Sequence, residues 1–268
     1  LEAGGHVWME KPGASRLEDV ERMIGARQSS GKQAAVGYKW MYFQTVQKAR
    51  QLMSEEDFGE PSLLLLERVE KMPAAEDVAA YLKREANPPG MSGFMDHLCH
   101  PASGMISLFG DPDTLTWQHG ANGSGLLSFT FPHGGLASIS IHRGGGLSGG
   151  GSTIKIVGTG GRTVLIENNV RLKYCRGPRF PEGQRYGNTP NYFTGPPEAT
   201  TAYWEPEFQI GQLYCKGLFL LGYFDEIDTF VRSALADRPV PRGHLGHLRT
   251  VTRIFEALAE GPGRVIRL

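Results

Sequence analysis

The sequence of 268 residues has few cysteines, no excess charge of either sign and no long apolar run. Its three cysteines, Cys99, Cys175 and Cys215, are an odd and widely spaced set. That number and spacing argue against a disulfide framework and a zinc knuckle, so a reducing, cytoplasmic setting is expected. Lys and Arg number 28 and Asp and Glu number 28, which gives a net charge of zero. Nucleic acids and anionic membranes attract basic proteins, so we expect neither as a partner.

The longest candidate apolar run, residues 63–66, is far shorter than the roughly 20 residues of a membrane-spanning helix. The composition, 40% hydrophobic and 21% charged, is that of a globular protein. Residues 1–5 contain no initiator Met and resemble a helix end followed by a glycine turn. We therefore expect that an N-terminal part of the protein precedes Leu1.

The first part of the chain has the order strand, helix, strand, which is typical of a parallel sheet with crossover helices. Residues 6–10 and 33–38 are the apolar strands. Between them, Ser15 and Glu18 have the spacing of a capping box at the start of a helix. The helix carries apolar residues at helical spacing and is expected to end at Gly31.

From about residue 43 the pattern changes to helices and a long series of strands. Helices are expected over residues 43–53, 92–109, 213–236 and 244–259, and strands over 63–69, 114–118, 126–131, 136–142, 153–157, 163–166 and 170–174. Most of the strands are joined by glycine-rich turns of hairpin length, which predicts a largely antiparallel sheet. Residues 177–206 are rich in Pro, Gly and aromatics without a period, so we expect a lid, an interface arm or a disordered loop.

The densest group of reactive side chains is Asp96-His97-Leu98-Cys99-His100. On a helix, Asp96 and His100 are separated by one turn and face the same side. A carboxylate that bonds one imidazole nitrogen leaves the other as a base near neutral pH. An equally good interpretation is a structural Asp–His pair or a buried histidine. A metal site from Asp96, His97 and His100 is less favoured, because His97 points roughly 100° away from Asp96.

Glu10-Lys11-Pro12 follows the first strand. Ligands of open α/β sheets bind at the carboxyl ends of strands, where a lysine can polarise a carbonyl group or donate to a hydroxyl group. A charged pair before a proline also commonly does no more than end a strand.

The run of residues 144–149 matches the G-x-G-x-x-G pattern of dinucleotide-binding proteins, and Glu167 follows at a fitting distance. That pattern must open a helix whose N-terminus holds the pyrophosphate. The next segment, residues 152–157, alternates and carries β-branched residues, which indicates a strand. We therefore interpret the run as a glycine-rich hairpin loop.

Taken in order, residues 6–12 (HVWMEKP), 36–38 (VGY) and 93–100 (GFMDHLCH) resemble the Gfo/Idh/MocA family of NAD(P)-dependent oxidoreductases. This family includes glucose–fructose oxidoreductase and inositol dehydrogenase. The resemblance extends to residues 58–60 and 221–226, and so over essentially the whole chain. It implies a Rossmann domain followed by an α+β domain with a large, open, mainly antiparallel sheet.

In that arrangement residues 1–42 would be the C-terminal remnant of the Rossmann cofactor-binding domain, and residues 43–268 the substrate-binding and oligomerisation domain. The family's first strand, its glycine fingerprint and the residue that selects NAD or NADP would lie upstream of Leu1. An open sheet of this kind implies a homodimer or homotetramer.

The resemblance also implies site residues. Lys11 is similar to the family lysine beside the nicotinamide and the substrate hydroxyl, and His100 to the general base that takes the hydroxyl proton. Asp96 is similar to the partner that holds the substrate or the imidazole. Glu10, Lys11 and Pro12 would contact the cofactor, and Lys39, Asp96 and His100 the substrate. Where the family often has an arginine-containing turn, Lys39 is the only charge.

The activity so implied is hydride transfer between NAD or NADP and a secondary alcohol of a sugar, cyclitol or related polyol, with no metal. One alternative is a non-catalytic homologue that acts in assembly or ligand binding. A second, less favoured alternative is a metal-dependent hydrolase that uses Asp96, His97 and His100.

Overall fold

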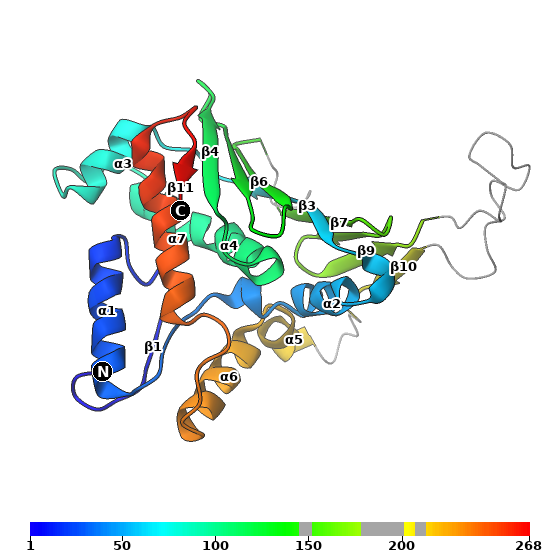
Figure 1. Cartoon of the computed structure of the whole chain (residues 1–268), viewed down its shortest axis with the longest axis horizontal. Coiled ribbons are helices and arrows are strands. Elements are labelled where there is room, and N and C mark those ends of the chain that lie inside the picture. Colours follow the sequence, from blue (N-terminus) through cyan, green and yellow to red (C-terminus); the bar gives the residue numbers. More distant parts are fainter. Residues whose placement is uncertain (145–151, 178–200, 207–212) are drawn as a thin grey trace, which may run out of the picture.

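The computed structural model describes residues 1–144, 152–177, 201–206 and 213–268 (Figure 1). The helices are α1 (Leu17–Ser30), α2 (Gln44–Met53), α3 (Ala75–Leu82), α4 (Met91–Phe109), α5 (Leu213–Leu220), α6 (Tyr223–Leu235) and α7 (Leu245–Ala257). The strands are β1 (Val7–Met9), β2 (Ala34–Val36), β3 (Pro61–Val69), β4 (Thr114–His119), β5 (Gly125–Thr130), β6 (Leu136–His142), β7 (Thr153–Gly158), β8 (Thr163–Glu167), β9 (Arg171–Cys175), β10 (Thr201–Trp204) and β11 (Ile266–Arg267). Within these ranges, no helix combines the length and the apolar character that crossing a bilayer requires.

Strands β1 and β2 form a small parallel sheet, with α1 as the crossover between them. This confirms the predicted order of strand, helix and strand and the predicted end of α1 at Gly31, which has a left-handed backbone. The predicted capping box is wrong, because α1 begins after Arg16 and has no side-chain cap. Instead, the Leu17 amide donates to Glu256 Oε1 of α7 at 2.8 Å, so the packing of α7 on α1 replaces the local cap.

The large sheet has the strand order β10-β9-β8-β7-β3-β6-β5-β4-β11. All pairings in it are antiparallel except that of β3 with β6, so the prediction of a mainly antiparallel sheet is confirmed. Strands β6 and β7 lie on opposite sides of β3 and do not pair with each other. The glycine-rich run after β6 is therefore not a hairpin loop, and this interpretation is corrected. The segment that follows it is the predicted strand, whereas residues 145–151 lie outside the described residues.

Other elements differ from the prediction. Helices α5 and α6 replace the single helix over 213–236, because Gly222 has a φ of 71° and separates them. Strand β10 pairs with β9 inside the segment predicted to lack structure, whereas residues 178–200 of that segment lie outside the described residues. Helix α3 and strand β11 were not predicted.

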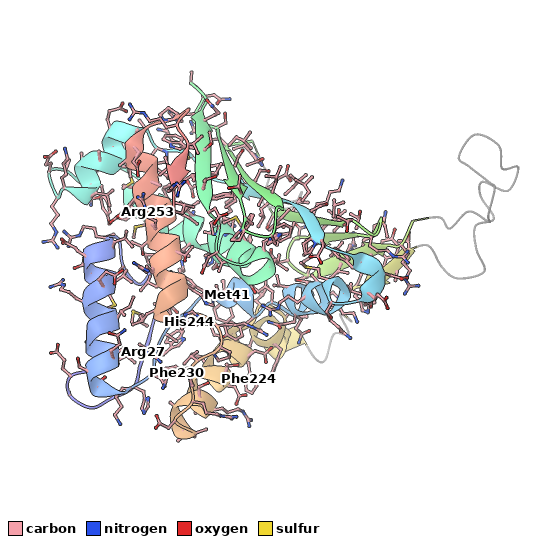
Figure 2. All side chains as sticks on the ribbon, in the orientation of Figure 1. Arg27, Met41, Phe224, Phe230, His244 and Arg253 are labelled. Carbon is pink, nitrogen blue, oxygen red and sulfur yellow. The ribbon has the colours of Figure 1, made fainter. Side chains whose placement is uncertain are left out.

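Helices cover one face of the large sheet: α4 packs against β3, and α2 packs against β8 and β9 (Figure 1). The turn between β2 and α2 carries the buried residues Tyr38, Trp40 and Met41 and packs against α4. Met41 is labelled in Figure 2. The opposite sheet face carries exposed leucines, among them Leu126 and Leu136. The expected oligomer contact through the open sheet would lie on this face, and it stays a prediction.

Helix α7 is fixed to the parallel layer at its N-cap residue, His244. His244, labelled in Figure 2, forms a bridge with Ala35 of β2, and its Nδ1 accepts from the His247 amide. The Val36 amide donates to the Gly243 carbonyl at 2.7 Å. These contacts fix the end of β2 relative to the helical layer.

The close approach of β7 to the turn at Phe58 gives a test of the packing. A Cβ at Gly158 would overlap the Phe58 carbonyl oxygen, so Gly158→Ala should lower the free energy of unfolding by about 1–3 kcal/mol. Gly25→Ala is the matched control, because nothing lies within 4 Å of its added methyl group inside α1. That control should raise stability by roughly 0.5–1 kcal/mol. Urea unfolding of the two variants checks both signs; equal effects would contradict this packing.

Candidate functional site

Lys11 lies directly after β1 and reaches α4. Its Nζ donates to Asp96 Oδ2 at 2.5 Å, and the side chains of the pair are 21% and 35% exposed. The Lys11–Pro12 peptide bond is cis, and the Pro12 carbonyl accepts from the buried Tyr38 hydroxyl at 3.2 Å. Since Tyr38 follows β2, the hydrogen bond between Tyr38 and Pro12 connects the carboxyl ends of the two parallel strands. Lys11 and Asp96, predicted as site residues, are thus brought together from 85 positions apart.

His100 lies one turn after Asp96 on α4 and is 6% exposed. Its ring stacks on Trp40, with 5.8 Å between the centroids and 15° between the planes. Nδ1 of His100 is buried and has no hydrogen-bond partner. The hydrogen bond expected between Asp96 and His100 is therefore not formed, because Asp96 is bonded to Lys11.

The environment of His100 favours the neutral imidazole. Burial, together with the positive charges of Lys11, Lys39 and Arg68, lowers its pKa to about 3. A neutral ring can accept a proton from a ligand, but the nearby cations oppose the imidazolium that results.

The three side chains that a metal site would require point to different partners. Asp96 is bonded to Lys11, His97 Nδ1 is paired with Glu70 Oε2, and His100 stacks on Trp40. Among the residues that the structure describes, no group of three or more His, Cys, Asp or Glu side chains could hold a metal ion.

Lys39 lies beyond the end of β2, next to the start of α6. Its Nζ contacts the Tyr223 hydroxyl and lies 4.5 Å from the centre of the Tyr223 ring. Gly222 allows this approach, because a Cβ at that residue would lie 2.7 Å from the Lys39 carbonyl oxygen. Lys39 also adds to the positive potential at His100. Glu10 is exposed, and its Oε2 accepts from the Lys11 amide at 3.3 Å.

Two charged residues of this region escaped the sequence analysis. Arg68 stands on β3, and its Nε is buried without a partner. Glu226 of α6 is 4% exposed, and its Oε2 has no partner. The sequence held one signal for Arg68. It continues the alternating series of Leu64 and Leu66, whose side chains face inward, so a charge stands at an inward-facing position.

Unpartnered buried polar atoms are rare in proteins, so their grouping is informative. Three of those in the described ranges belong to Arg68, His100 and Glu226. Electrostatic interactions connect them, because Arg68 and Lys39 act on His100, and Lys39 acts on Glu226. The ends of β1, β2 and β3 and the facing turns of α4 and α6 therefore form one polar cluster that a ligand can complete.

Glu226 supplies a pH test of this cluster. Burial and the negative charge of Glu10 raise its pKa to about 8. The folded protein therefore binds this proton more tightly than the unfolded chain, and the stabilisation is lost as pH rises from about 4.5 to 8. Glu226→Gln should match the parent near pH 4.5 and exceed its free energy of unfolding by about 2–5 kcal/mol above pH 8.

Urea unfolding of Glu226→Gln and the parent at both ends of this pH range measures the difference. The matched control is Glu18→Gln on α1, since the Glu18 side chain is 68% exposed. A difference for Glu226→Gln that stays constant with pH would show that the carboxyl group is solvated.

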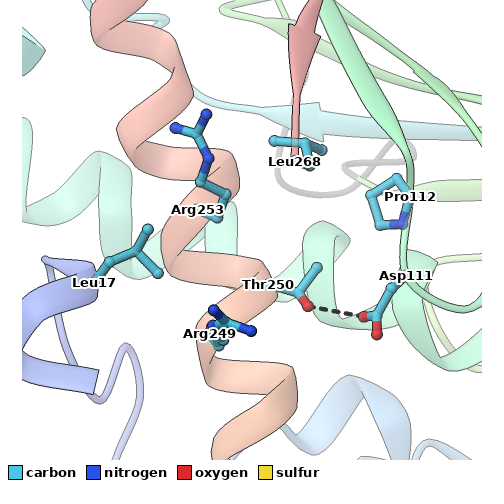
Figure 3. Close-up of a pocket in the computed structure, with 7 residues that line it drawn as sticks. All are labelled: Leu17, Asp111, Pro112, Arg249, Thr250, Arg253 and Leu268. Carbon is cyan, nitrogen blue, oxygen red and sulfur yellow. Dashed lines mark hydrogen bonds between the residues drawn. The ribbon is translucent and has the colours of Figure 1, made fainter. Parts of the chain in front are cut away.

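The cavity in Figure 3 lies elsewhere. It has a volume of about 360 Å³. Residues of α1, of α7 and of the segment before β4 line it, together with the C-terminal residue. Thr250 Oγ1 donates to Asp111 Oδ1 at 2.8 Å across it. None of Lys11, Asp96 and His100 lines this cavity, so it does not belong to the polar cluster.

Comparison with known proteins shows the fold. No protein-family model and no curated protein match the chain. Solved structures match over nearly all of it. A dehydrogenase from Chromobacterium violaceum has a TM-score of 0.73 and 18% identity, over 96% of this chain and 69% of that one. An NAD-binding oxidoreductase from Klebsiella pneumoniae has a TM-score of 0.71 and 18% identity, over 99% of this chain and 74% of that one.

A third structure is the WlbA dehydrogenase from Chromobacterium violaceum in complex with NADH and UDP-GlcNAcA. Its TM-score is 0.64 at 18% identity, over 100% of this chain and 72% of that one. At these identities the likeness shows that the chain shares the mixed α/β fold of these dehydrogenases, with its large and mainly antiparallel sheet.

Proposed function

We propose that the chain is an NAD(P)-dependent oxidoreductase that transfers a hydride between the nicotinamide and a secondary alcohol of a sugar, cyclitol or related polyol. The observation that carries this proposal is the 2.5 Å pair between Lys11, at the end of a parallel strand, and Asp96, one helical turn before the neutral His100. The solved structures of the same fold are dehydrogenases and oxidoreductases, and one of them holds NADH and a UDP-sugar.

The residues at the strand ends fit the reactive end of such a cofactor. Glu10, Lys11 and Pro12 would lie against the nicotinamide, at the edge where open parallel sheets bind nucleotides. The unpartnered atoms of His100 and Glu226 leave polar groups that a ligand can satisfy. When bound, NAD(P) would supply the acceptor for the hydride.

The roles of the side chains follow from their charges. Lys11 Nζ would donate to the hydroxyl oxygen of the substrate and hold it near the ring of His100. His100, neutral and buried, would take the hydroxyl proton as the hydride leaves the same carbon. Asp96 anchors Lys11, and Lys39 beyond β2 would contact a more distant substrate hydroxyl.

The proposal is tested by mixing the protein with NAD⁺ or NADP⁺ and a panel of aldoses, sugar acids and inositols, and following formation of reduced nicotinamide. Where the reading frame continues upstream of Leu1, the longer protein is assayed alongside. Reduction of either cofactor by one of these alcohols is expected. Absence of both cofactor binding and turnover would refute the proposal.

The alternative is a non-catalytic homologue that binds ligands. Binding of a sugar without any binding of NAD(P) would identify this alternative.

A further inference from the structure

Arg68 lies at the carboxyl end of β3, on the face that α4 covers. Side chains alternate between the faces of a strand, and Leu64 and Leu66, which precede Arg68 on the same face, are fully buried. Helix α4 packs against β3, and it carries Asp96 and His100. The Arg68 side chain therefore extends from the inner face of the sheet toward the polar cluster.

The Arg68 side chain makes no hydrogen bond and no ion pair with any described residue, and its Nε is buried. The two carboxylates that act on it electrostatically are Glu70 and Asp96. Each of them has other partners: Glu70 is paired with His97 and accepts from the Lys71 amide, whereas Asp96 accepts from Lys11. The buried Nε of Arg68 is thus left without the acceptor that a buried donor normally has.

Three cations, Lys11, Lys39 and Arg68, act on His100 of the facing helix. The two carboxylates that act on Arg68 are each bonded to another residue. The Nε of Arg68 is buried and cannot be hydrated where it lies.

We propose that Arg68 binds an anionic group of the ligand, a carboxylate or a phosphate, and so makes an acidic sugar or polyol the substrate class of this site. The planar guanidinium presents paired donors that match both oxyanions. The inference rests on the proposed function for the polyol part of the ligand. The contact between Arg68 and the anion is measured as binding and needs no turnover.

The experiment is a titration of the whole chain with D-glucuronate, D-glucose 6-phosphate and D-glucose, with and without NAD⁺, followed by ligand-observed NMR at constant ionic strength. At least one acidic sugar should bind about tenfold or more tightly than glucose. Arg68→Gln should weaken binding of that sugar about 10- to 100-fold and leave glucose unchanged. Arg264→Gln, at an exposed arginine beyond α7, should change neither.

Arg68→Lys keeps the charge without the fork and should retain part of the preference. Should Arg68→Gln fail to fold, the affinities of the acidic and neutral sugars for the parent chain and for Arg68→Lys test the inference. Preference for glucuronate or for the 6-phosphate identifies the anion. Equal binding of glucose, no binding of either acid, or an unchanged Arg68→Gln would overturn the inference.

The outcome also separates this inference from the proposed function. Oxidation of neutral polyols by NAD(P), without a preference for acids, would uphold the function and refute the role of Arg68. Binding of glucuronate that depends on Arg68, without any reduction of NAD(P), would uphold the role of Arg68 and refute the function.

Discussion

Replacing Lys11 with Met is expected to lower the kcat of NAD(P)-dependent polyol oxidation by about 10²–10³-fold, the usual cost of removing one donor to a reacting oxygen. Lys11 Nζ is the cation held at the strand end by Asp96, at 2.5 Å. Methionine has a similar length and no charge, so the variant removes the donor and keeps most of the packing. Steady-state kinetics of Lys11→Met and Lys11→Arg provide the measurement.

The loss should come from chemistry rather than from unfolding. A pair with side chains 21% and 35% exposed contributes only about 0–1 kcal/mol to stability. The melting temperature of Lys11→Met should therefore stay close to that of the parent. Lys83→Met, at an exposed lysine after α3, is the matched control and should keep full activity. Turnover that is unchanged in Lys11→Met would show that Lys11 does not act in the reaction.

The sequence alone predicted the elements that carry the site. Strand β1, helix α1 and helix α4 are recognisable from the spacing of their apolar residues and from the residues that end them. The sequence could not identify the partner of Asp96. A helical spacing predicts local pairs such as Asp96 with His100, whereas the observed bond to Lys11 depends on how the parallel layer packs against α4. The ring of Trp40, which stacks on His100, likewise comes from a turn with no local signal for that contact.

The remaining errors have related causes. Strand β11 has two residues and is formed by pairing with β4, so it has no period of its own to detect. The break between α5 and α6 depends on the backbone of Gly222, which packs against Lys39 and Tyr42. Arg68 and Glu226 were missed because a single charge within an apolar pattern does not show whether its side chain is buried. The structure shows that Glu226 and the Nε of Arg68 are buried.

Replacing His100 with Asn is expected to lower kcat by about 10²–10⁴-fold, the range that general bases contribute. In the unliganded protein His100 has a pKa of about 3, so it is neutral at physiological pH. The rate kcat/KM should therefore show no loss near pH 6.5 from protonation of this residue. A fall with a midpoint at that pH would show that His100 is solvated.

The same pKa shift predicts an effect on stability. Because the folded-state pKa of His100 lies below the unfolded value of 6.5, its contribution is lost as pH falls from about 6.5 toward 3. His100→Asn should abolish that part of the acid sensitivity, whereas His119→Asn, at an exposed histidine of β4, should not. In Lys11→Met the pKa of His100 should rise, since one of the cations that oppose the imidazolium is gone. An NMR titration of the His100 ring checks this rise, and an unchanged pKa would mean that Lys11 does not act on the proposed base.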